Sequence, residues 1–331
     1  LVRAHAPHQP AGLKREAHMF GRPLLRFVRK DTHINFMRGR HMGLIVSAVL
    51  SVASLILFFH PGLTLGLDFR GGIVVEAKTS GPADFAKLRA ALASHGIQHA
   101  SLQSFGGADD VLIRLDTGEG QNTQAIVDQV RHTLDQTLPG TTILRADAVG
   151  ASVSAELFRN GILALVLSLA MILVYIWVRF EWEFALSAVV TLVLDLTKTM
   201  GFLVLTGFEF DLVMVAAILT ILGYSTNDKV VVYDRVRENL RRYRSMPLID
   251  LINLSINETL NRTLGTSSTV FLASLPLALW GGSTLSGFAW TMLFGIVVGT
   301  SSSIFIAAPL LLFMGEGRLK RDAKAPAASK A

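Results

Sequence analysis

Four ionisable residues lie inside long apolar stretches of the sequence, and their spacing divides them into two pairs. Asp195 and Lys198 are three residues apart, so on a helix they share one face and can form an ion pair. Asp228 and Lys229 are adjacent, so on a helix their side chains point in different directions. A charged group inside a membrane costs roughly 2.5–3.5 kcal/mol and usually marks an ion or proton pathway. The pattern therefore indicates proton or ion coupling, and a purely structural pair between Asp195 and Lys198 is the alternative.

The length of the stretch around Asp228 determines whether this carboxylate is inside a membrane. The continuous apolar run from Leu212 to Tyr224 has 13 residues, whereas a helix needs about 20 to cross a bilayer. The run reaches that length only if it continues to about Tyr233, which places Asp228 within the span. The alternative is a helix that ends near Tyr224, with Asp228 at the lipid headgroups. We expect the longer helix.

Further polar residues accompany these four. Asn227 precedes Asp228, Arg262 opens the next apolar stretch, and Thr266 follows one turn later. This set suits proton transfer better than covalent catalysis. The sequence has no P-loop, no nucleophile motif, no cysteine and no histidine within an apolar stretch. We therefore predict neither an enzyme, nor a cofactor, nor a metal site.

The composition is that of a polytopic α-helical membrane protein. Hydrophobic residues make up 51% of the 331 residues, and the mean hydropathy is +0.46. The net charge of +6 could suggest nucleic-acid binding, but the basic residues cluster beside apolar stretches, which is typical of membrane orientation. We therefore expect no nucleic-acid partner. The sequence predicts six transmembrane helices, at about residues 43–60, 161–178, 184–205, 212–233, 263–280 and 288–314.

The only large polar block, residues 61–155, separates the first two spans. Alternating and helical patterns predict strands near 73–77, 102–105, 111–115 and 141–149, and helices near 82–94 and 122–138. This order predicts one small ferredoxin-like α+β domain, large enough to bury its own core. The domain is either a rigid spacer or a unit that contacts a partner. The remaining spans form a bundle over residues 156–314.

The distribution of Lys and Arg predicts the orientation. Residues 1–42 contain nine, residues 235–262 contain six and residues 315–331 contain five, whereas the loops 207–211 and 281–287 contain none. The N-terminal segment 1–42 and the tail 315–331 are therefore expected in the cytoplasm, and the block 61–155 on the periplasmic side. Met19 is a candidate native start.

Two small patterns carry further predictions about packing. Ile249, Ile252 and Ile256 form one apolar stripe, which predicts that the cytoplasmic segment 235–262 includes a helix lying on the membrane surface. Gly295, Gly299 and Ser303 recur every four residues, which is typical of close helix packing, either within this chain or against a partner.

Three motifs resemble those of the SecF family, which belongs to the RND superfamily. The segment Gly66-Leu-Asp-Phe-Arg-Gly-Gly72 is similar to a motif that SecF and SecD share after the first span. The segment Gly223–Asp228, followed by Val231–Asn239, closely resembles the fourth-span motif of SecF, and Asn261-Arg262-Thr263 resembles the start of its fifth span. The residues that carry the family signature are Gly66, Asp68, Arg70, Gly71, Gly72, Asp234, Arg235, Glu238 and Asn239.

The resemblance implies a function and partners. SecF acts with SecD in the bacterial inner membrane and assists preprotein export through the SecYEG channel, using the proton motive force. The implied partners are SecD, SecYEG, unfolded preproteins, protons and membrane lipids, with YajC as a further candidate. In that family the residues matching Asp228 and Arg262 are implicated in proton transport. The alternatives are half of an RND-type exporter of lipids or small molecules, and a structural membrane scaffold.

Two positions depart from the SecF pattern. The family commonly has His-Asp in the third span, where this chain has Leu194-Asp195, and Ser or Thr after the fourth-span aspartate, where this chain has Lys229. An intramembrane lysine is costly. It pairs with an acid, extends towards the cytoplasm, or marks an altered or uncoupled protein, and the sequence leaves these three possibilities open.

Overall fold

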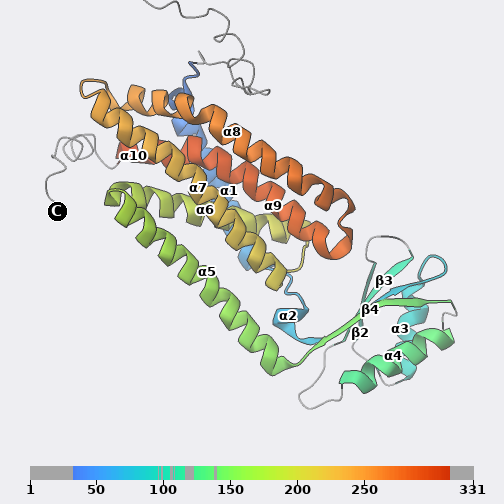
Figure 1. Ribbon diagram of the computed structural model, residues 1–331. Coiled ribbons are helices and arrows are strands. Elements are labelled where there is room, and N and C mark those ends of the chain that lie inside the picture. The colour runs from blue at the N-terminus through green and yellow to red at the C-terminus, as the bar shows by residue number, and fades with distance from the viewer. Residues whose placement is uncertain are drawn as a thin grey trace, which may run out of the picture.

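Long helices form a bundle, and a small α/β domain lies at one end of it, as the computed structural model shows (Figure 1). The structure describes residues 33–95, 97, 100–104, 107, 109–115, 123–137 and 140–313. Several predicted features lie outside the described residues: the N-terminal segment up to residue 32 with Met19, the tail 315–331, and the ends of predicted elements at Phe105, Asn122 and Leu138.

Six helical stretches of the described chain are long and apolar enough to cross a membrane, which confirms the predicted number. The first combines η1 (Phe36–Gly39) with α1 (Arg40–Phe59), and the last combines α9 (Gly282–Ser302) with η2 (Ser303–Ala307) and α10 (Ala308–Phe313). The four between them are α5 (Ala151–Arg179), α6 (Trp182–Thr206), α7 (Leu212–Arg242) and α8 (Leu248–Trp280).

Helix α7 is continuous through both charged residues that the sequence singled out. It has 31 residues, so the expected longer helix is confirmed and the alternative end near Tyr224 is wrong. Helix α5 begins at Ala151, earlier than predicted, because strand β4 (Thr142–Val149) leads into it through Gly150 alone. The predicted boundary between residues 155 and 156 therefore lies inside a helix.

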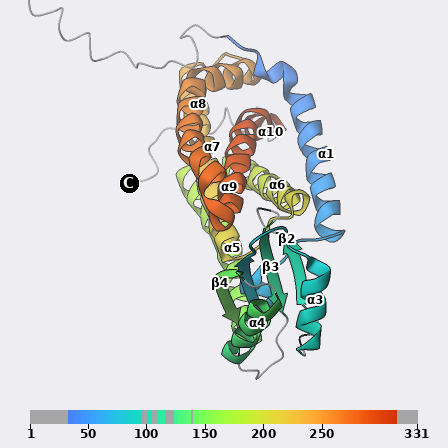
Figure 2. The ribbon, with the colours of Figure 1, turned by 90° about the vertical axis from the view of Figure 1, so that its right-hand side faces the viewer.

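Helix α8 joins the predicted amphipathic segment and the fifth span in one helix. Ile252 and Ile256 are buried in the bundle core, whereas Ile249 is exposed. The side chains of Asn253 and Asn257 bond the backbone of Phe36 and Ile34, which holds the first turns of α8 beside the start of α1 (Figure 2). Part of the apolar stripe thus packs on protein, while the location of this segment at the membrane surface stays a prediction.

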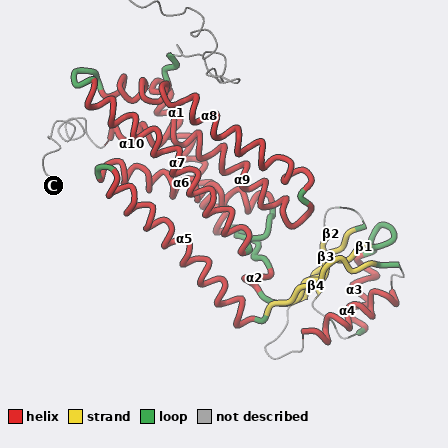
Figure 3. Tube along the Cα trace, viewed as in Figure 1, coloured by secondary structure: helices red, strands yellow, loops and turns green. Residues whose placement is uncertain are grey.

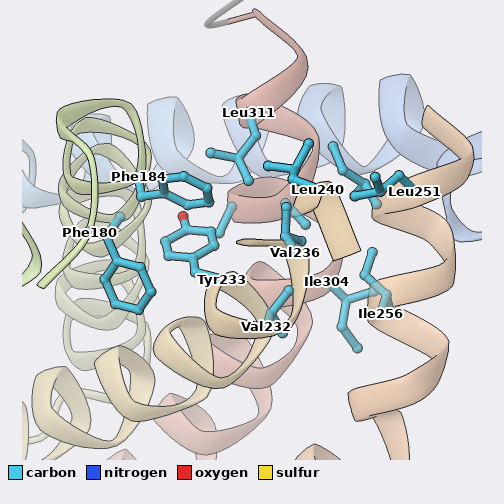
Figure 4. Close-up of a cluster of buried hydrophobic side chains, with 14 of the residues drawn as sticks. Phe180, Phe184, Val232, Tyr233, Val236, Leu240, Leu251, Ile256, Ile304 and Leu311 are labelled. Atoms are coloured by element: carbon cyan, nitrogen blue, oxygen red, sulfur yellow. The ribbon is translucent and has the colours of Figure 1, made fainter. Parts of the chain in front are cut away.

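The largest buried cluster of the bundle lies where α5, α6, α7, α8 and η2 meet (Figure 4). Tyr233 is fully buried there, and its ring packs edge-on against Phe184 with 5.2 Å between ring centroids. Its hydroxyl donates to Ser187 Oγ at 3.0 Å, so the polar end of this buried ring has a partner. This cluster fixes the C-terminal half of α7 against its neighbours.

Two close helix contacts depend on glycine. A Cβ on Gly201 of α6 would lie 2.9 Å from Ser54 Cα, so only glycine lets α1 approach through its buried face, which consists of Ser47, Ser51 and Ser54. A Cβ on Gly299 of α9 would lie 3.0 Å from Ser225 Oγ of α7. The predicted small-residue stripe of the last span therefore packs within this chain and not against a partner.

The small α/β domain, called the external domain because it lies outside the helix bundle, has the predicted order of two helices and four strands. Its elements are β1 (Gly72–Lys78), α3 (Phe85–Ser94), β2 (Ala100–Ser104), β3 (Asp110–Leu115), α4 (Thr123–Thr137) and β4. The sheet has the order β2-β3-β1-β4 with antiparallel pairs throughout (Figure 3). Alternate residues such as Ile73, Val75 and Ile113 form a core with α3 and α4. A short helix that the sequence did not predict, α2 (Leu67–Arg70), joins α1 to β1.

Candidate functional site

The centre of the candidate site is Asp195, midway along α6. The residue is 1% exposed, and its carboxylate accepts hydrogen bonds from two other helices, α7 and α9, and from its own. Lys198 Nζ lies 3.4 Å from Oδ1, as the three-residue spacing predicted. Ser225 Oγ at 3.1 Å and Ser302 Oγ at 2.6 Å donate to Oδ2. A buried carboxylate needs such donors, because an unpaired charge inside a protein is strongly unfavourable.

Lys229 is the second buried partner of Asp195. Its Nζ lies 3.1 Å from Asp195 Oδ2 and 3.2 Å from Ser302 Oγ, and the side chain is fully buried. It also donates to Ser225 Oγ one turn earlier on α7. Of the three possibilities that the sequence left open for this lysine, the structure shows pairing with an acid. The pair joins α6 to α7 across 34 residues of sequence.

Asp228 lies on α7 beside this network but makes different contacts. It is 3% exposed, and the hydroxyls of Thr263 on α8 and Ser303 in η2 are its polar neighbours. Its Oδ2 is buried and has no hydrogen-bond partner in the described chain. The buried set therefore holds two carboxylates and two ammonium groups, whose formal charges cancel. Of the two carboxylates, only Asp195 forms ion pairs within the described chain.

The structure leaves three of the predicted site residues outside this cluster. Asn227 on α7 and Thr266 and Arg262 on α8 are all exposed on the bundle surface. The Thr266 hydroxyl bonds the backbone carbonyl oxygen of Arg262 instead. Thr263, and not its neighbour Arg262, faces Asp228, because consecutive residues of a helix point in different directions.

The serines that complete the cluster were not predicted. Ser225, Ser302 and Ser303 are buried, and the last two are consecutive residues at the point where α9 gives way to the π-helical turn η2. In that arrangement Ser302 contacts Asp195, and Ser303 contacts Asp228. π-helical turns are frequent at functional sites. The available sequence signal was weak: a run of three serines in an otherwise apolar span.

The second signature segment, residues 234–239, ties α7 to its neighbours at the end opposite the external domain. Arg235 donates to Glu258 on α8 at 2.7 Å and to Glu238. Asn239 is fully buried and donates to Glu258 at 2.7 Å and to Ser255 at 3.0 Å. Asp234 pairs with Arg179 at the end of α5 at 3.2 Å. These signature residues thus serve helix packing, away from the buried cluster.

The first signature segment, residues 66–72, lies between α1 and β1. Gly71 and Gly72 have φ values of +77° and +106°, a region that favours glycine. Asp68 Oδ2 accepts a hydrogen bond from the backbone nitrogen of Leu212 at 3.1 Å, at the start of α7. Gly66 is buried against Asp211, and Arg70 is exposed. The first signature segment therefore contacts the helix that carries Asp228 and Lys229, and the second is part of that helix.

Within the described residues, no group of three or more His, Asp or Glu side chains could hold a metal ion. The buried carboxyl, ammonium and hydroxyl groups can accept, donate and relay protons. The arrangement suits the movement of a proton or small cation between helices better than bond-breaking chemistry.

Comparison with known proteins identifies the family. The family described as protein export membrane protein SecD/SecF, C-terminal, matches residues 129–317, and the SecD/SecF GG motif matches residues 56–83. The protein translocase subunit SecF of Rickettsia bellii is 40% identical over 298 residues, which cover 90% of this chain and 98% of that protein. The chain belongs to the SecF family. SecF of Cereibacter sphaeroides is likewise 40% identical, over 91% of this chain and 96% of the relative.

Solved SecDF structures share the fold of this SecF-family chain. The crystal structure of SecDF, a translocon-associated membrane protein from Thermus thermophilus, matches with a TM-score of 0.79 and 31% identity over 87% of this chain. SecDF in a super-membrane-facing form matches with a TM-score of 0.67 and 32% identity over 91% of this chain. The chain spans 39% and 41% of the length of these two SecDF chains. The family, predicted from the motifs, and the multi-pass membrane fold, predicted from the apolar stretches, are therefore confirmed.

Proposed function

We propose that this SecF-family chain acts with a SecD subunit to assist protein export through the SecYEG channel, and that proton transfer at the buried cluster drives this work. The observation that carries the proposal is the set of buried carboxyl and ammonium groups between α6 and α7. Buried charges lower stability relative to apolar packing, so a bundle that only had to be a scaffold would gain nothing from them.

Within this proposal Asp228 is the group that binds and releases the proton. Its carboxyl is buried and one oxygen has no hydrogen-bond partner, whereas Asp195 is held by two lysines and two serines. A proton on Asp228 would remove a charge that no ion pair compensates. Thr263 and Ser303 are the hydroxyls that could pass it on. A change in charge at Asp228 would then alter the packing of α7 against α8 and η2.

The proposal assigns Arg262 and Asn227 to the contact with SecD. Asn227 is exposed on α7 and Arg262 is exposed on α8. An arginine side chain in contact with lipid is energetically costly. The two SecDF chains that match this one are more than twice as long. The part of such a chain that this protein does not match would here be supplied by a separate SecD subunit. A SecD half packed against α7 and α8 would cover Arg262 and so remove its charge from contact with lipid.

Complementation tests the proposed function. The chain should restore export in a SecF-depleted strain, and a tagged copy should co-purify with SecD. A variant with Asp228→Asn should co-purify equally well but restore little export. Full restoration in a strain that also lacks SecD would contradict the proposal, and so would co-purification without any restored export.

The proposed orientation places both termini in the cytoplasm and residues 61–155 in the periplasm. The chain has no cysteine, so single cysteines can be introduced cleanly. Gly107→Cys in the external domain and Gly282→Cys at the start of α9 should react with a membrane-impermeant thiol reagent in spheroplasts. Arg244→Cys, between α7 and α8, should react only after the membrane is opened. The opposite pattern would reverse the orientation.

A further inference from the structure

The loop that joins α6 to α7, residues 207–211, is held by the segment that leads into the external domain. Phe210 N donates to the carbonyl oxygen of Thr64 at 2.7 Å, and Gly66 N donates to the carbonyl oxygen of Phe210 at 2.9 Å. A Cβ on Gly66 would lie 2.8 Å from Asp211 Cβ, so the two segments can approach this closely only with glycine there. The contact is a short parallel pairing between residues far apart in sequence.

The first turn of α7 is capped from both segments. Asp211 Oδ1 accepts from Met214 N at 2.8 Å, and Asp68 Oδ2 accepts from Leu212 N at 3.1 Å. Carboxylates are favoured at a helix N-terminus, where backbone N–H groups lack partners. Burial, with a smaller effect from the charge of Asp68, raises the pKa of Asp211 above its ordinary value. One cap belongs to the bundle and the other to the signature segment, so α7 cannot shift without disturbing the signature segment.

The central sheet of the external domain reaches the same loop. Arg114 of β3 points away from the core that the sheet forms with α3 and α4, and it is 7% exposed. Its guanidinium forms an ion pair with Glu209 and donates to the carbonyl oxygen of Leu65 at 3.3 Å. Arg114 therefore bonds both the loop before α7 and the residue that directly precedes the signature segment.

Phe69 fixes the signature segment to the bundle. Its ring is buried, with centroids 5.4 Å from Phe158 on α5 and 5.3 Å from Phe210 in the loop. A Cβ on Gly161 would be 3.4 Å from this ring, so α5 also packs closely here. The segment is thus packed on α5 and on the loop before α7 as well as hydrogen-bonded.

We propose that Arg114, Glu209 and Asp68 form a clasp that transmits displacement of α7 to the external domain. The same helix carries Asp228 and Lys229, so a change at the buried cluster would move the clasp and, through β3, the sheet. Glu209 and Arg114 are positioning residues in this proposal, since neither contacts the buried cluster. The inference rests on the proposed function, in which α7 responds to protons.

The first test separates proton movement from the work that it drives. The chain is reconstituted with SecD and the Sec channel, and proton flux and gradient-stimulated export are measured together. Arg114→Gln should reduce the stimulation of export at least about tenfold, since it breaks the ion pair that joins β3 to the loop before α7. Proton flux should persist. The charge exchange Arg114→Glu with Glu209→Arg should restore part of the stimulation, and Arg89→Gln on the exposed face of α3 is the control.

The clasp is wrong if Arg114→Gln keeps full stimulation, or if it loses flux and stimulation together. A distance measurement tests the clasp independently of export. Spin labels at Lys87→Cys on α3 and Trp280→Cys on α8 report the position of the external domain relative to the bundle. Arg114→Gln should broaden this distance distribution, and an unchanged distribution would refute the clasp. If Arg114→Gln broadens the distance distribution but the parent chain supports neither proton flux nor gradient-stimulated export, the proposed function fails and the clasp does not.

Discussion

Asp195→Asn is expected to leave little folded protein in the membrane. The substitution removes the carboxylate that both Lys198 and Lys229 contact, and it leaves two ammonium groups in a site that excludes water. Removing one partner of a buried ion pair costs about 3–5 kcal/mol, which is a large part of the stability of a typical domain. Quantitative blotting of membrane fractions and thermal unfolding in detergent measure this loss.

A second substitution separates folding from function. Lys229→Met removes one of the unpaired ammonium groups with a side chain of similar length, so Asp195→Asn with Lys229→Met should recover much of the protein level. Export should not recover with it, because the double variant has lost the charges that the proposed mechanism uses. Asp234→Asn is the control, since its pair with Arg179 is largely exposed and such pairs contribute at most about 1 kcal/mol. A stable Asp195→Asn single variant would contradict the central place of Asp195.

Asp228→Asn is expected to have the opposite profile. The amide has nearly the same size as the carboxyl, and no ion pair is lost, since Asp228 takes part in none in the described chain. The folded protein should therefore reach normal levels. The contribution of the proton gradient to export should disappear, because an amide side chain, unlike a carboxyl group, does not ionise near neutral pH.

The measurement is export by membrane vesicles with and without a proton gradient, at matched protein levels. The gradient should stimulate the parent chain and leave the Asp228→Asn variant unstimulated, while export driven without the gradient continues. Asp234→Asn, the same substitution at an exposed position of α7, is the matched control and should behave as the parent. Gradient-stimulated export by Asp228→Asn at the parental rate would exclude this residue as the proton site.

The sequence alone determined the helices and strands, and it showed which charged residues lie within apolar helices, where burial is costly. Apolar length predicted six spans, because a bilayer sets a minimum helix length. The same minimum length predicted that α7 continues past Asp228. Periodicity predicted the strands and helices of the external domain. The three-residue spacing predicted the contact between Asp195 and Lys198, since that contact lies within one helix. These properties are local, so they can be recognised along the chain.

Only the tertiary structure determined which side chains from different helices contact one another. The rotation of α7 about its axis, fixed by Gly299 and by the Tyr233 cluster, turns Lys229 towards Asp195 and leaves Asn227 exposed. The rotation of α8 likewise presents Thr263 and not Arg262 to Asp228. The clasp joins residues of the external domain to a loop of the bundle that lies far along the chain. Such pairings depend on how whole helices and the sheet pack, which spacing within a single segment does not specify.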